Sequence, residues 1–235
     1  MRKTLFALAI MFLTISDARS QDNVLNEYVG IKQLYDNATK GSSFILTGDE
    51  YIFPNIRRTG TFFYPSDSLE TGSIYYNGYL YTDIPLQWDI FSNYVLTLAG
   101  SGTSKIILRN DLIDSFLIGH HRIIKMNEDR SKNLYNTDFY EVLYRGPVSV
   151  FARRQKVAEQ QNDDNKVVYN LRDEDKYYLE KDGIFYRVSR KNDVLNVFTR
   201  YRTEINRIIN KENLNWKKQF ELCLVAAATS INESK

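Results

Sequence analysis

The sequence predicts a mainly β fold: an antiparallel meander of hairpins forming a curved or barrel-like sheet, with C-terminal α-helices packed on it, α+β overall. From about Phe44 to Val188, short runs of β-branched and aromatic residues alternate with turn residues. The segments between these runs are too short for the crossovers that parallel strands need, so we expect mostly antiparallel pairing. At Ser189 the apolar period changes to that of a helix, which predicts a helical cap over residues 189–235.

The first twenty residues predict a signal peptide that is removed on export. Arg2 and Lys3 form a short positive region, and the apolar run Leu5–Ile15 is too short for a permanent membrane span. Small residues before Gln21 predict cleavage there, with cleavage at Ala18 as the alternative and a retained anchor as the other interpretation. We therefore expect a mature chain in the periplasm, at the cell surface or outside the cell, without a transmembrane span.

The charge balance argues against a nucleic-acid partner. The chain has 31 basic and 29 acidic residues, and the predicted signal peptide holds three of the former and one of the latter, which leaves 28 of each. Nucleic-acid-binding proteins normally carry a basic excess or stripe. The locally basic stretch Ile184–Lys218 and the locally acidic stretch Glu159–Asp175 are interpreted as solvated faces.

Cys223 is the only cysteine, so the chain cannot form an intramolecular disulfide despite its predicted export. A chain of this length can bury an adequate core without one. Cys223 lies at helical spacing from Phe220, Leu224 and Ala227. This setting predicts a buried, small apolar residue rather than a nucleophile.

The β-rich region, residues 21–188, is predicted to open with a short helix at residues 24–38. The candidate strands that follow are β-branched and aromatic runs bounded by turn residues. The polar and acidic stretch Glu159–Asn165 predicts a flexible loop. The candidate strands are Ser43–Leu46, Tyr51–Phe53, Thr61–Tyr64, Ser73–Tyr76, Tyr79–Thr82, Leu86–Phe91, Tyr94–Leu98, Lys105–Leu108, Ser115–Ile118, Arg122–Lys125, Phe139–Tyr144, Val148–Arg153, Lys176–Glu180 and Ile184–Val188.

Residues 75–91 are unusually rich in aromatic side chains. Asn77-Gly78 favours a type I′ turn, which would place Tyr76 opposite Tyr79. Cross-strand aromatic pairs stabilise a hairpin by about 0.2–1 kcal/mol each, so these rings have a structural role without any ligand. Asp182-Gly183 predicts a second hairpin with the same kind of turn.

An exposed binding surface is the alternative role for this aromatic stretch. Along residues 84–91 the side chains of one face are more apolar than those of the other, which predicts a half-buried sheet. If the hairpin region binds a ligand, Tyr75, Trp88 and Phe91 are the candidate contact residues.

The C-terminal region predicts three helices, the first of them capped by Ser189. The last helix, from about Asn215, carries one continuous apolar stripe that requires a surface to cover it. We expect the β region to cover it, with a partner protein as the alternative. The apolar residues that share helix faces are Val194, Val197, Phe198 and Tyr201, then Ile205, Ile208 and Ile209, and finally Phe220, Cys223, Leu224, Ala227, Ala228 and Ile231.

Motifs for nucleotide, metal and serine chemistry are incomplete in this sequence. The stretch AGSGTSK, residues 99–105, lacks the spacing of a phosphate loop and predicts a tight turn between two strands. His120 and His121 are the only histidines, and neighbouring strand residues point to opposite faces, so they cannot chelate one metal as a pair. They predict a hairpin tip after Gly119. We therefore assign no catalytic residue, no metal site and no cofactor.

Paired carboxylates are the remaining route to an enzyme. Asp83 with Asp89, or Asp49 with Glu50, could serve as an acid and a base in a hydrolase. The separation that a glycosidase needs between its two carboxylates is a spatial property, which the sequence does not contain.

Three segments resemble a group of exported bacterial proteins of the Gram-negative envelope whose function is unknown. They are GSIYYNGYLYTDIPLQWDIFSNYVLTL, DFYEVLYRG, and SRKNDVLNVF followed by INRIINKENLNWKKQFELCL. In that group a Tyr-x-Gly hairpin precedes a Pro-Leu-x-x-Asp-aromatic strand, and a Lys/Asn-rich link joins the C-terminal helices. The resemblance implies an envelope protein and assigns no catalytic residue.

These observations lead to two functional hypotheses. The first is an exported, non-catalytic envelope protein that binds or supports a protein or glycan partner. The alternative is a carboxylate-dependent hydrolase that acts on an envelope glycan or peptide. The incomplete catalytic motifs favour the first hypothesis.

Overall fold

The computed structural model describes residues 44–163 and 166–233. The chain divides into one unit that ends at Leu46 and a second that begins at Thr47. The described part of the first unit is a 3-10 helix, η1 (Phe44–Leu46), where the sequence predicts a strand. The predicted signal peptide, residues 1–20, and the predicted helix, residues 24–38, lie outside the described residues.

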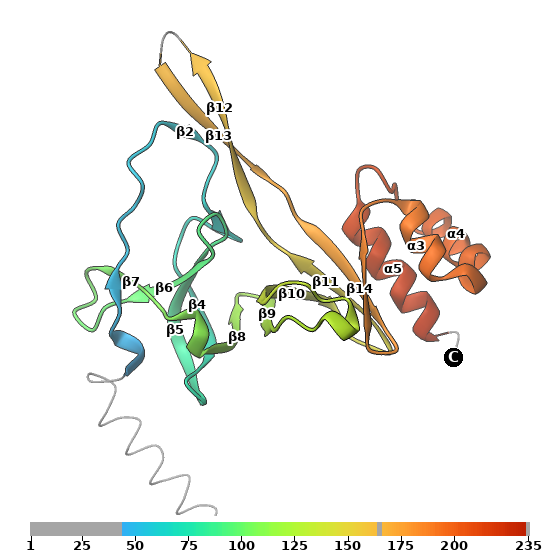
Figure 1. The fold of residues 1–235 in the computed structure, drawn as a ribbon, viewed down its shortest axis with the longest axis horizontal. Coiled ribbons are helices and arrows are strands. Elements are labelled where there is room, and N and C mark those ends of the chain that lie inside the picture. Colours follow the sequence, from blue (N-terminus) through green and yellow to red (C-terminus); the bar gives the residue numbers. More distant parts are fainter. Residues whose placement is uncertain (1–43, 164–165, 234–235) are drawn as a thin grey trace, which may run out of the picture. The chain divides into compact units, whose positions relative to one another are not determined.

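The second unit is built on an open, antiparallel sheet of twelve strands, which confirms the predicted mainly β meander (Figure 1). Its strand order is β1-β7-β6-β5-β4-β8-β9-β10-β11-β14-β15, with β3 paired to β5 outside this path. The strands are β1 (Asp49–Glu50), β3 (Phe63–Tyr64), β4 (Glu70–Tyr76), β5 (Tyr79–Asp89), β6 (Tyr94–Leu98), β7 (Lys105–Ile107), β8 (Ile113–Ile118), β9 (His121–Met126), β10 (Asp138–Tyr144), β11 (Val148–Arg153), β14 (Lys176–Lys181) and β15 (Ile184–Val188). Two 3-10 helices, η2 (Asn110–Leu112) and η3 (Arg130–Lys132), lie between strands.

A second, three-stranded sheet replaces the flexible loop that the sequence predicts at Glu159–Asn165. It consists of β12 (Lys156–Asp163), β13 (Lys166–Asp173) and β2 (Arg58–Thr59), and β2 pairs with β13 in parallel. The strands β12 and β13 form a long ribbon (Figure 1). The prediction was wrong because β12 is mostly polar, and it pairs with β13 along its whole length without the apolar alternation that marks a half-buried strand.

The Tyr-rich hairpin has the predicted register. Tyr76 pairs with Tyr79, and the backbone φ angles of Asn77 and Gly78 are 52° and 78°, as a type I′ turn requires. The two strands predicted after this turn are one strand, β5, because a bulge at Asp83 joins them. Asp83 has no partner between the paired residues of β4, and its φ angle is 57°.

The second half of β5 is buried on both faces, whereas the sequence predicts a half-buried strand. Trp88 is fully buried, and its ring packs edge-on against Phe116 and Phe139 at centroid distances of 5.5 and 6.3 Å. Asp89 on the other face is also buried, and the Tyr51 hydroxyl contacts it. Its carboxylate accepts hydrogen bonds from the Tyr51 hydroxyl and two backbone N–H groups.

The C-terminal helices pack on β10, β11, β14 and β15, as predicted. The helices are α3 (Lys191–Val197), α4 (Arg202–Lys211) and α5 (Phe220–Glu233), with the 3-10 helix η4 (Thr199–Tyr201) between the first two. They lie together beside β14 in Figure 1. Cys223 is fully buried among them, which confirms its apolar role, and burial raises the pKa of its thiol. The predicted cap Ser189 instead donates its hydroxyl to Asp193 in the first turn.

This shared core joins sheet and helices through aliphatic side chains. The buried members from the sheet are Val148, Val150, Leu179 and Val188, and those from the helices are Val194, Phe198, Ile205, Ile209, Cys223, Leu224, Ala227, Ala228 and Ile231. Most of the predicted apolar faces therefore contribute to one cluster. The sheet covers the stripe of α5, as expected.

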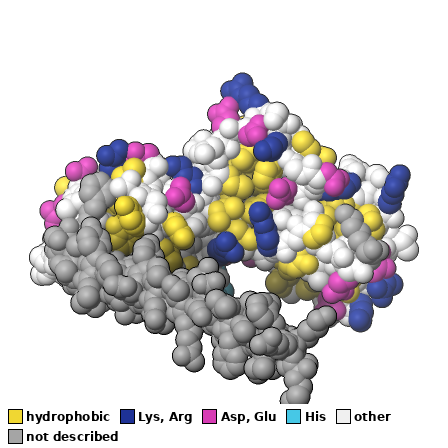
Figure 2. Space-filling model, turned by 90° about the horizontal axis from the view of Figure 1, so that it is seen from below, with side chains coloured by type: hydrophobic (Ala, Val, Ile, Leu, Met, Phe, Trp, Pro, Cys, Tyr) yellow, Lys and Arg dark blue, Asp and Glu magenta, His cyan; other side chains and the backbone are white. Residues whose placement is uncertain are grey.

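Charged side chains of both signs are distributed over the surface. Figure 2 shows basic and acidic side chains interspersed over the face in view, with apolar side chains between them. This distribution follows from a composition in which basic and acidic residues are nearly balanced. In the part of the chain that the structure describes, every helix is too short or too polar to cross a membrane.

Candidate functional site

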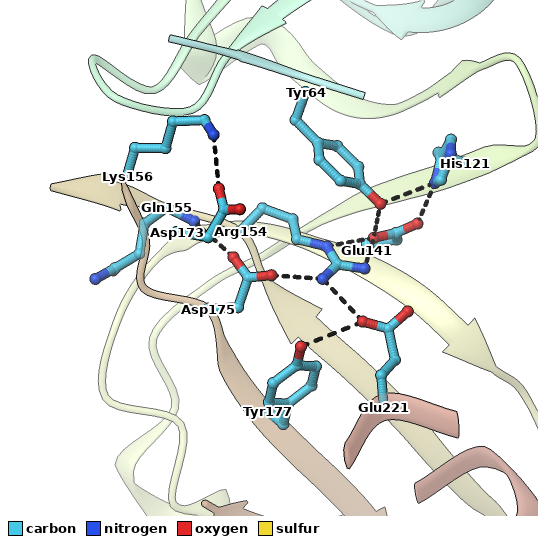
Figure 3. A network of polar contacts seen from close by, with 10 residues as sticks. All are labelled: Tyr64, His121, Glu141, Arg154, Gln155, Lys156, Asp173, Asp175, Tyr177 and Glu221. Atoms are coloured by element: carbon cyan, nitrogen blue, oxygen red, sulfur yellow. Dashed lines mark hydrogen bonds and ion pairs between the residues drawn. The ribbon is translucent and has the colours of Figure 1, made fainter. Parts of the chain in front are cut away.

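Arg154 is the centre of a buried polar network (Figure 3). Its side chain is 6% exposed, and its Nε donates to Glu141 Oε2 at 2.6 Å. Its Nη1 donates to Asp175 Oδ2 at 2.6 Å and to Glu221 Oε2 at 2.9 Å. Glu141 belongs to β10, Asp175 precedes β14, and Glu221 lies in the first turn of α5. One guanidinium therefore connects the sheet to the last helix.

Three carboxylates share this one cation. Burial opposes the charge of Arg154, but the hydrogen bond to Glu221 and the charges of Glu141 and Asp175 outweigh it and raise its pKa above the usual value. Burial raises the pKa of Asp175, although Arg154 acts in the opposite direction. Removing the guanidinium would leave uncompensated acidic groups in a buried setting.

Tyr64 and His121 extend the network on the side of β10. The Tyr64 hydroxyl donates to Glu141 Oε2 at 2.9 Å and lies 3.1 Å from His121 Nδ1. His121 Nδ1 is 2.5 Å from Glu141 Oε1, and the Tyr64 ring centroid is 4.8 Å from Arg154 Cζ. Burial raises the pKa of Tyr64, which keeps its hydroxyl a donor. Both carboxylate oxygens of Glu141 therefore have polar partners.

The two histidine rings lie together, contrary to the prediction of opposite faces. The centroids of His120 and His121 are 4.0 Å apart. The prediction was wrong because His120 belongs to the turn after Gly119 and only His121 is in β9, so strand alternation does not apply to the pair. Among the described residues, no group of three or more His, Cys, Asp or Glu side chains could hold a metal ion.

A cavity of about 640 Å³ adjoins the Arg154 network and shares Asp175 and Tyr177 with it. It is bounded by the start of β14, the end of β15, the start of α3 and the residues that lead into α5. This volume is within the range of about 300–1,000 Å³ that small-ligand sites occupy.

Three aromatic rings line the cavity, and the ring of Phe220 contacts each of the other two. The Phe220 ring centroid is 5.5 Å from that of Tyr177 and 5.8 Å from that of Trp216. The Tyr177 hydroxyl donates to Glu221 Oε2 at 3.2 Å, which fixes the orientation of its ring. Burial and the charges of Glu221 and Asp175 raise the pKa of Tyr177 to about 12.

Five basic side chains also line the cavity. They come from the ends of the strands, from the start of α3 and from the link before α5. Asp175 is the one carboxylate among the described lining residues, and Arg154 binds it. The basic lining residues are Lys176, Arg187, Arg190, Lys191 and Lys217.

The contact residues predicted on the aromatic hairpin do not converge. Tyr75 on β4 is 45% exposed, and Phe91 just after β5 is 39% exposed with its ring 5.1 Å from that of Phe62. Trp88 is in the core and presents no surface to a ligand. A binding role for Tyr75 and Phe91 stays a prediction.

The predicted carboxylate pairs also serve other purposes. Asp89 is buried and bonded within its turn, Asp83 forms the bulge of β5, and Asp49 with Glu50 forms the exposed edge strand β1. The AGSGTSK stretch is the predicted turn, closed by a hydrogen bond from Ala99 N to Ser104 O at 2.8 Å.

Sequence reasoning missed the Arg154 network and the cavity. Arg154 and Glu221 are 67 positions apart, and no local pattern connects them. The cavity did leave a signal, because the basic stretch Ile184–Lys218 ends beside Trp216 and Phe220. That stretch was interpreted as a solvated face, but several of its side chains surround one concave site.

Comparisons with known proteins add no constraint on this site. No protein-family model, no curated protein and no solved structure matches the chain. The functional argument therefore depends on the geometry and chemistry of the residues.

Proposed function

We propose that the protein is an exported, non-catalytic protein of the bacterial cell envelope that binds a glycan in the cavity beside α5. The N-terminal segment and the resemblance to exported envelope proteins support the export and the location. The observation that carries the binding role is the group of three contacting aromatic rings in a cavity of about 640 Å³.

Aromatic rings are suited to such a ligand for a physical reason. They offer large apolar faces with few rotatable bonds, so the contact loses little conformational entropy. The hydrogen bond from Tyr177 to Glu221 and the packing of Phe220 hold two of the rings before any ligand arrives. A preorganised site loses less free energy on binding.

The hydrolase alternative has weaker support. A glycosidase needs two carboxyl groups on either side of the scissile bond. Among the described residues that line the cavity, Asp175 is the one carboxylate, and Arg154 binds it at 2.6 Å. We therefore favour binding over hydrolysis.

Calorimetric titration of the mature protein with envelope polysaccharides tests this proposal. We expect saturable binding that Trp216→Ala weakens at least about fivefold, as removal of an aromatic contact in a binding site does. Tyr135→Ala is the matched control, because Tyr135 is 61% exposed and lies outside the cavity. The proposal fails if no polysaccharide binds, or if the two variants bind equally well.

A further inference from the structure

The charge around the cavity is strongly one-sided. Five of the described lining residues are basic and one is acidic, on a chain with 31 basic and 29 acidic residues. The acidic residue, Asp175, already binds Arg154. Glu221, which follows the lining residue Phe220, binds Arg154 as well. Arg154 therefore pairs with two carboxylates at the edge of the cavity.

Most of the cavity's cations have no acidic partner. Arg190 is bonded to Asp193 at 3.1 Å. For Lys176, Arg187, Lys191 and Lys217, the described part of the chain provides neither an ion pair nor a side-chain hydrogen bond. Two of these, Lys176 and Lys191, are half-buried. A cation without an acidic partner can pair with an anionic group of a ligand.

We propose that the cavity recognises an acidic saccharide, which is a sugar that carries a carboxylate or a phosphate group. This inference rests on the proposed glycan-binding function and specifies its ligand. The aromatic rings of Trp216 and Phe220 pack against the sugar, and Lys176 and Lys191 pair with the acidic group.

The indole N–H of Trp216 is consistent with a ligand rich in oxygen. Its Nε1 is buried and has no acceptor within the part of the chain that the structure describes. A buried donor without an acceptor is unfavourable.

Titration with matched oligosaccharides tests this inference. The probes are a galacturonic acid tetramer, a singly phosphorylated galactose tetramer, the neutral galactose tetramer and inorganic phosphate. We expect at least one acidic tetramer to bind about tenfold or more tightly than the neutral one, and the tighter of the two identifies the acidic group. We also expect its affinity to fall as salt is added, because ion pairs near the surface are screened.

Charge variants locate the binding. Lys176→Gln and Lys191→Gln should each weaken the acidic tetramer about three- to tenfold, and weaken it more than the neutral tetramer. Lys166→Gln is the matched control, because Lys166 is an exposed lysine at the start of β13 and does not line the cavity. Equal effects of all three variants would overturn the inference.

The outcomes separate this inference from the proposed function. If the neutral tetramer binds as tightly as the acidic ones, the acidic specificity is wrong and glycan binding stands. If inorganic phosphate binds as tightly as the phosphorylated tetramer, the sugar contributes nothing and glycan binding itself is wrong. If no tetramer and no polysaccharide binds, both proposals are wrong.

Discussion

The β4–β5 hairpin and the cavity beside α5 are both rich in aromatic residues, yet their rings are used differently. In the hairpin, Tyr76 pairs across the strands with Tyr79, and Tyr75 is partly exposed at the surface. In the cavity, Phe220 contacts Tyr177 and Trp216, and basic side chains also line the wall.

The difference shows that aromatic content alone does not mark a binding site. Cross-strand pairing accounts for aromatic residues in a hairpin. A concave wall on which aromatic rings stand beside cations that have no acidic partner among the described residues has the composition of a ligand site. We therefore propose the cavity as the ligand site, and cross-strand pairing is sufficient to explain the aromatic residues of the hairpin.

We expect the largest loss of stability from the substitution Arg154→Met. Arg154 joins Asp175 on one cavity wall to Glu221 beside the other. It also binds the buried Glu141, so this change leaves a buried carboxylate without its cation. Removing one partner of a buried ion pair costs about 3–5 kcal/mol of the free energy of unfolding. Urea denaturation monitored by tryptophan fluorescence measures this loss.

Arg109→Met is the control for that experiment. Arg109 is bonded to Asp111 at 2.6 Å, but both side chains are more than half exposed, and we expect no measurable change in stability. If Arg154→Met is as stable as Arg109→Met, the network does not hold the cavity walls together.

We expect a smaller loss of stability at alkaline pH, caused by the Tyr177 phenol. Its folded pKa of about 12 exceeds the unfolded value of about 10, so the folded state binds its proton more tightly. The corresponding stability is present below about pH 10 and is lost as the pH rises toward about 12. Tyr177→Phe lacks this loss, so the difference in unfolding free energy between wild type and variant should narrow above about pH 10.

Denaturation at a series of pH values measures that difference. Tyr75→Phe is the matched control, because it removes the hydroxyl of an exposed tyrosine on the β4–β5 hairpin. A difference between wild type and Tyr177→Phe that stays constant from about pH 9 to about pH 11 would contradict the buried, hydrogen-bonded phenol.

The sequence predicts those features that depend on neighbouring residues. Asn77-Gly78 and Asp182-Gly183 determine their hairpins because few residue pairs adopt two positive φ angles in succession. The stripe of α5 predicts its own burial because helical spacing places its apolar residues on one face.

Features that depend on distant residues were not predictable in this way. Arg154 finds its acids on β10, before β14 and on α5, and only the folded chain brings them together. The ribbon of β12 and β13 was missed for another reason, since its ladder is made by backbone groups and the side chains of β12 are mostly polar. The candidate site combines both difficulties, because its wall comes from four separate segments of the chain.

Chemical-shift mapping by NMR tests the central claim most directly. The isotope-labelled mature protein is titrated with the galacturonic acid tetramer, with the phosphorylated tetramer as a second titration. We predict that the largest shifts occur at Lys176, Tyr177 and the Trp216 indole N–H, and that Tyr75 and Phe91 do not respond. Shifts that concentrate at Tyr75 and Phe91, with none around the cavity, would contradict the account and return the binding role to the hairpin.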